Sequence, residues 1–152
     1  MQSHEVTVHI RSLSFLALFL CLIGSAAFAA ALPVDDPDRF ANETFTLISQ
    51  NKFHDAAHKI AETVGEPKFE KQMERGLKAI EGRKFDFGKK VYDKDYNGAL
   101  RQIIYVSYFE KTGFIYFRFT YKMTSRGWFL TDFLFKDGGS GLFPKNFIEE
   151  PS

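Results

Sequence analysis

Two histidines stand four residues apart in the segment His54-Asp55-Ala56-Ala57-His58. On a helix this spacing places both imidazoles on one side, where they can share a zinc ion. The segment imitates the H-E-x-x-H pattern of zinc proteases, with the shorter aspartate in the glutamate position. No further histidine follows it, and the pair lies on the polar flank of its predicted helix. We therefore interpret both as solvated surface residues and predict neither a bound metal nor a cofactor.

The segment Asp93-Lys94-Asp95-Tyr96-Asn97-Gly98 matches the first six positions of a calcium-binding loop, including the glycine of its sharp turn. Position nine of such a loop is Arg101 here, and position twelve, which should be a bidentate glutamate, is Ile104. A complete EF-hand is therefore excluded. We favour a polar turn between two strands, in which the Asn-Gly pair supplies positive φ angles. A degenerate calcium site is the alternative.

Asp132 is a candidate acid–base residue because it lies among aromatic residues, with Tyr105 or Tyr121 as a candidate partner. Apolar surroundings raise the pKa of a carboxyl group, which lets it exchange a proton near neutral pH. Asp86 is a second candidate for the same role. A lone aspartate in a strand is more often structural, so we predict no catalytic residue.

Other common catalytic constellations are missing from the sequence. It has no glycine-x-serine-x-glycine elbow, no phosphate-binding glycine loop and no dinucleotide-binding fingerprint. The two histidines beyond residue 29 both fall on one predicted helix, which argues against a Ser-His-Asp triad. Enzymatic activity is therefore the less favoured interpretation.

These segments follow a predicted secretory signal peptide over residues 1–29. Residues 13–23 form an apolar run, preceded by Arg11 and followed by small residues that end in Ala27-Phe28-Ala29. The run of about 11 residues is much shorter than the roughly 20 that span a bilayer. We predict cleavage near Ala29 to Ala31 and a periplasmic or secreted protein without stable membrane insertion.

Composition narrows the chemistry further. Cys21 is the only cysteine and falls within the predicted signal, so the remaining chain contains no disulfide and no thiolate. The balance of 20 Lys+Arg against 19 Asp+Glu argues against nucleic acid as a partner. We predict a lead-in over 30–37, one domain over 38–137 and a flexible tail over 138–152. Folding of the tail onto the sheet is the alternative.

The first half of the domain has helical periodicity. A helix is predicted to begin near Asp38 and to end at a break around Asn51, and a second follows until Gly65. A third begins at Pro67 and ends at Gly82. Apolar residues recur every three or four positions, so each helix has one stripe to bury.

After residue 82 the period changes to two, which indicates strands. Four are predicted, the first over 85–91, the second over 100–109, the third over 114–123 and the fourth over 128–136. Their short connections force antiparallel pairing of neighbours in a meander. The predicted fold is α+β, with N-terminal helices packed on one face of a curved four-stranded antiparallel sheet.

Residues 38–136 resemble the nuclear transport factor 2-like superfamily. The passage Asn51-Lys52-Phe53-x-x-Ala56 is similar to the break in its first helical region, and Gly127-Trp128-x-Leu130 is similar to the start of its last strand. The resemblance implies a cone-shaped, cystatin-like fold in a group that includes ketosteroid isomerases, scytalone dehydratase and many non-catalytic exported domains. Catalytic members carry an Asp or His acid–base pair inside the cone, and this chain cannot be matched to those positions residue by residue.

Aromatic residues are dense on both faces of the last three strands. Because helices can cover only one face, the other needs a ligand, a second subunit or the tail to cover it. The residues assigned to a ligand site or interface are Tyr105, Tyr108, Tyr116, Phe119, Tyr121, Trp128 and Asp132. We predict an exported, non-catalytic binding or assembly domain, homodimeric or bound to a small apolar ligand. The alternative is a small-molecule isomerase, dehydratase or hydrolase with an acid–base residue in the cone pocket.

Overall fold

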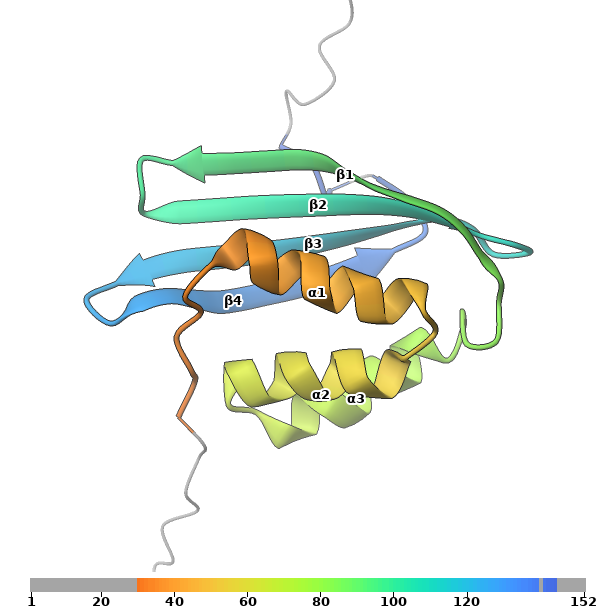
Figure 1. Cartoon of the computed structure of the whole chain (residues 1–152), viewed down its shortest axis with the longest axis horizontal. Helices are drawn as coiled ribbons and strands as arrows, with labels where there is room; N and C mark the ends of the chain where they lie inside the picture. The colour runs from red at the N-terminus through yellow and green to blue at the C-terminus, as the bar shows by residue number, and fades with distance from the viewer. Residues whose placement is uncertain (1–29, 140, 145–152) are drawn as a thin grey trace, which may run out of the picture.

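The computed structural model of the protein describes residues 30–139 and 141–144. The predicted signal peptide over 1–29 and the end of the predicted tail, 145–152, lie outside this part of the chain. Within it, three helices precede a four-stranded antiparallel sheet, which confirms the α+β fold (Figure 1). No described helix is long and apolar enough to cross a membrane.

The helices are α1 (Pro37–Ser49), α2 (Phe53–Val64) and α3 (Pro67–Leu77). Asp36 caps α1, because its carboxylate accepts the backbone N–H of Asp38 at 2.9 Å. Gly65 ends α2 with a left-handed φ of 74°. The third helix ends earlier than predicted, and residues 78–82 continue as turns.

The strands are β1 (Phe85–Tyr96), β2 (Leu100–Phe109), β3 (Gly113–Thr124) and β4 (Gly127–Lys136), paired in chain order. The first strand is longer than predicted, because residues 93–96 pair with β2 instead of forming a loop. The β1–β2 turn therefore shrinks to residues 97–99, in which Asn97 and Gly98 have positive φ angles of 56° and 71°.

All three helices lie on the same face of the curved sheet. The helix α1 crosses the middle of that face, and α2 and α3 form a hairpin beside it, toward β4 (Figure 1). Phe45 of α1 stacks on Tyr105 with ring centroids 4.3 Å apart, and its edge meets Phe117. The core therefore fills the space between α1 and the centre of the sheet.

Side chains of β3 alternate between the two faces as the sequence predicts. Ile115, Phe117, Phe119 and Tyr121 are buried toward the helices, whereas Phe114 points away from them and is exposed. The sheet therefore has one face that the helices cover and one opposite face, which carries the polar residues of β3.

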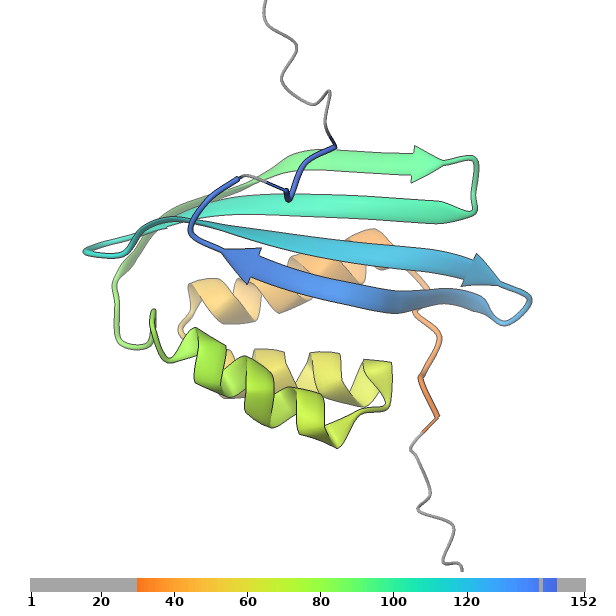
Figure 2. The same ribbon diagram turned by 180° about the vertical axis from the view of Figure 1, so that it is seen from behind.

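Residues 138–139 and 141–144 cross this opposite face, as seen from behind in Figure 2. Leu142 is fully buried, and Arg118 donates hydrogen bonds from Nη1 to the carbonyl oxygens of Gly141 at 3.2 Å and Leu142 at 3.4 Å. The ring of Phe143 meets that of Tyr116 edge-on. The described part of the tail thus takes the folded-back arrangement, which was the alternative to a flexible tail.

Candidate functional site

Four of the residues assigned to a ligand site lie on the face that the helices cover. Tyr105, Phe119 and Tyr121 are buried there, and Trp128 is half-buried at the start of β4. Burial raises the pKa of Tyr105 to about 12 and that of Tyr121 further. These three buried side chains belong to the core between sheet and helices.

Asp132 lies on the opposite face, away from both tyrosines. It is exposed, and its Oδ2 accepts a hydrogen bond of 2.8 Å from Nη2 of Arg118. A register shift between β3 and β4 turns the Asp132 side chain to this face. Thr120 pairs with Asp132 while its neighbour Tyr121 pairs with Leu130, so β4 has one extra residue at this point. The sheet therefore separates Asp132 from its candidate partners, and Asp86 is also exposed. These residues do not form an acid–base pair.

The segment considered for calcium is held by protein cations. Arg101 donates from Nε and Nη2 to the carboxylate of Asp93 at 2.9 Å each, and Lys90 donates at 3.1 Å. Although burial opposes it, these hydrogen bonds hold the pKa of Asp93 below its usual value. Asp95 accepts the N–H of Gly98, which closes the turn. The arrangement matches the polar turn that the sequence favours over a calcium site.

Three aromatic side chains form a row on the opposite face, near the β2–β3 hairpin. Phe87 pairs with Tyr108, and Tyr108 pairs with Phe114, so the row crosses β1, β2 and β3. Phe114 is 52% exposed and Phe87 46% exposed. We call Phe87, Tyr108 and Phe114 the aromatic row. Of the other two assigned residues on this face, Tyr116 lies under the tail and Asp132 pairs with Arg118.

Sequence reasoning placed Phe85 and Phe87 on one face of the first strand. A register shift between them turns their side chains to opposite faces, so Phe85 packs in the core and Phe87 joins the aromatic row. This shift explains why Phe87 was not assigned to a site. Phe114 was counted among the dense aromatics of the last three strands but was not assigned to a site either.

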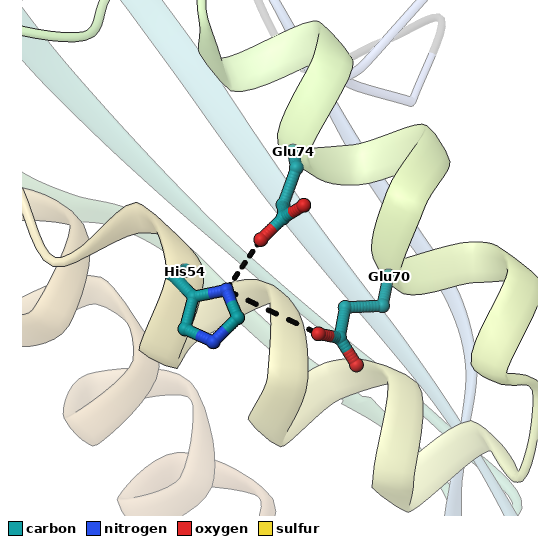
Figure 3. Close-up of side chains that lie close together, drawn as sticks. All are labelled: His54, Glu70 and Glu74. Carbon is teal, nitrogen blue, oxygen red and sulfur yellow. Dashed lines mark hydrogen bonds and ion pairs between the residues drawn. The ribbon is translucent and has the colours of Figure 1, made fainter.

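Histidines and glutamates meet where α2 lies against α3 (Figure 3). His54 Nδ1 is hydrogen-bonded to the carboxylate of Glu74 and lies 4.0 Å from Oε1 of Glu70. His58 Nδ1 lies 3.2 Å from Oε2 of Glu70. We call these four residues the His–Glu cluster. The histidines are surface residues, as predicted, but sequence reasoning missed the glutamates because they belong to another helix.

The cluster makes His54 sensitive to pH. A hydrogen bond to Glu74 and the negative charge of that carboxylate raise the pKa of His54 above its ordinary value. The pair therefore stabilises the fold fully below the unfolded pKa of about 6.5. This stabilisation is lost as the pH rises through the higher pKa of the folded state.

Replacing Glu74 by glutamine is expected to lower the pKa of His54 toward about 6.5, because the partner charge disappears. An NMR titration of the His54 ring protons measures this pKa. Glu81→Gln is the control, since Glu81 lies close to His54 but forms no ion pair with it among the described contacts. An equal decrease in both variants would contradict the assigned pairing.

Comparison with protein-family models, with curated proteins and with solved structures gives no match to this chain. The fold and the surfaces therefore define the class of protein. It is an α+β domain with one sheet face closed by helices and an aromatic row exposed on the other.

Proposed function

We propose that this chain is an exported, non-catalytic assembly domain that forms a homodimer through the aromatic row. The exposure of Phe87 and Phe114 on the opposite face carries this proposal. The apolar run over residues 13–23 supports export. The resemblance to nuclear transport factor 2-like proteins, which include non-catalytic exported domains, is consistent with such a role.

Other surfaces of the sheet are less suited to association. The helices cover one face, and the described part of the tail covers the centre of the other (Figure 2). Of the two edge strands, β1 carries Lys89, Lys90 and Lys94 and has two register shifts, which are features that discourage strand-to-strand pairing. The other edge strand, β4, is occupied at its start by Val34, which pairs with Trp128. The aromatic row thus remains as an uncovered apolar feature.

A second copy of the chain is a suitable occupant for the row. In a two-fold dimer the same patch meets itself, so each aromatic ring can stack on a ring of its mate. Lys84 and Glu110 form an ion pair of 3.0 Å at the same end of β1 and β2. In a two-fold dimer the lysine of one copy could face the glutamate of the other at the edge of the contact.

The size of the row predicts a weak dimer. A whole aromatic side chain buries roughly 150–250 Å², and about half of each exposed ring is already covered, so the row contributes about 300 Å² per partner. Stable interfaces bury about 800 Å² per partner. We therefore expect a monomer–dimer equilibrium that shifts with protein concentration.

The enzyme alternative receives less support. An isomerase, dehydratase or hydrolase of the cone type needs an acid–base residue next to its substrate. Asp132 and Asp86 are exposed, and Tyr105 and Tyr121 are buried in the core. Binding of a small apolar ligand to the aromatic row is a further alternative, which native mass spectrometry distinguishes from dimerisation.

Replacing Phe114 by lysine is expected to weaken dimerisation at least tenfold, because a charge replaces the most exposed ring of the apolar contact. Sedimentation velocity over a concentration series measures the dissociation constant. Met123→Lys is the matched control, since Met123 is 42% exposed and lies at the far end of the same strand. A chain that stays monomeric throughout, or an equal loss in both variants, would overturn the proposal.

A further inference from the structure

Two pairs of metal-ligating side chains face each other across the α2–α3 hairpin. His54 and His58 are one turn apart on α2, and Glu70 and Glu74 are one turn apart on α3. The contacts join His54 to Glu74 and His58 to Glu70, so the helices run antiparallel. Figure 3 shows His54 pointing between the two glutamates.

The distances suit a single ion. One ligand atom from each of His54, Glu70 and Glu74 lies within 4.8 Å of the others. Zinc binds histidine nitrogen and carboxylate oxygen at about 2.0–2.2 Å, which puts neighbouring ligands of a tetrahedral site roughly 3.4 Å apart. His54 and His58 have side chains 70% and 63% exposed, so small rotations close the remaining gap. His58 is outside this group of three, but its Nδ1 lies 3.2 Å from Oε2 of Glu70, which makes it the candidate for a fourth donor.

The donors favour a transition metal over calcium or magnesium. Imidazole is a preferred ligand of zinc, copper and nickel, whereas calcium and magnesium take oxygen ligands. Two carboxylates also balance the charge of a divalent ion. Within the described part of the chain, neither Glu70 nor Glu74 pairs with a lysine or arginine. Their partners are the two histidines, and a bound ion would replace the imidazole protons, so binding should strengthen as the pH rises.

Both ends of the cluster open to solvent. A depression of about 390 Å³ borders His58 and Glu70, and one of about 130 Å³ borders His54 and Glu74. An ion can therefore enter without separation of the helices, which is the entry path that a metal site needs.

We propose that the His–Glu cluster binds one divalent transition-metal ion, with zinc as the best chemical match, and that the ion ties α3 to α2. Met73 and Leu77 are the two buried residues of α3. A metal bridge to α2 would thus hold the helix that contributes least to the core. The inference does not depend on dimerisation through the aromatic row.

The test uses protein purified from full-length expression without a polyhistidine tag and stripped of metal with a chelator. Calorimetric titration with zinc chloride is expected to show one ion per chain. At a zinc concentration 100 times the dissociation constant, the melting temperature should rise by about 10 °C, because the ion binds only the folded hairpin. Cobalt as a probe should give the absorption spectrum of a tetrahedral site.

The single variants His58→Gln and Glu74→Gln should each weaken zinc binding at least tenfold, and circular dichroism of the metal-free variants checks that they fold. Asp55→Asn is the matched control, since it removes a charge from α2 outside the cluster. Failure to bind one zinc ion, unchanged affinity in the cluster variants or an equal loss in the control would overturn the proposal.

Discussion

Replacing Phe117 by alanine is expected to lower the free energy of unfolding by about 3–5 kcal/mol. Phe117 is fully buried, its ring stacks on those of Phe133 and Phe135, and its edge meets Phe45 of α1. Truncation removes these apolar contacts and leaves a cavity, which the neighbouring rings cannot fill because they are already closely packed. Urea unfolding followed by circular dichroism measures the change.

Phe114→Ala is the control for this substitution, because Phe114 lies on the same strand but points away from the helices. We expect it to change the free energy of unfolding of the monomer by about 0.5 kcal/mol or less. Equal destabilisation by the two variants would contradict the assignment of the core to the helix-covered face.

Adding a single methyl group at Gly88 is expected to cost about 1–3 kcal/mol. A Cβ there would lie 2.5 Å from Cζ of Phe45 and 2.7 Å from Cζ of Phe85. Both distances are far below van der Waals contact, so the rings that join α1 to β1 must move. Intrinsic strand propensity favours alanine over glycine, and the steric term should outweigh it. Urea unfolding of Gly88→Ala tests this.

The double variant Gly88→Ala with Phe45→Leu assigns the cost to its cause. If the methyl group collides with Phe45, the two substitutions should be less destabilising together than the sum of their separate effects, with a coupling of about 0.5–3 kcal/mol. Gly138→Ala is the control, since a Cβ there meets no atom within 4 Å. Strict additivity, or an equal cost at Gly138, would show that close packing at Gly88 is not the cause.

The order and type of the elements followed from local patterns. Gly65 ends α2 and Pro67 begins α3 as predicted, because glycine tolerates a left-handed φ and proline suits the first helical turn. The alternation in β3 also indicated its core face correctly. These features depend on neighbours along the chain, so they can be read from the sequence.

The register shifts could not be predicted in this way. The shift between Phe85 and Phe87 turns Phe87 to the opposite face, and the shift beside Thr120 sets the direction of Asp132. A single extra residue reverses every later side chain of a strand, yet pairing with the adjacent strand decides where it occurs. For this reason the sequence could not show that Asp132 lies on the face opposite to Tyr105 and Tyr121, its expected acid–base partners.

The composition of the His–Glu cluster could not be predicted from local sequence patterns either. The spacing of His54 and His58 predicts that they share one side of a helix, but only tertiary packing brings Glu70 and Glu74 to them. A search for a further histidine therefore missed two carboxylates on the next helix. The apolar residues Leu142 and Phe143 left a folded-back tail open as an alternative, but the sequence could not decide between that and a flexible tail.

Native mass spectrometry of the protein, purified without refolding, tests the proposed dimerisation through the aromatic row most directly. If the aromatic row joins two copies, the spectrum should contain a dimer with no bound small molecule, and its fraction should fall on dilution. A monomer that carries a small apolar adduct at every concentration would contradict this account. It would identify the protein as a ligand carrier instead.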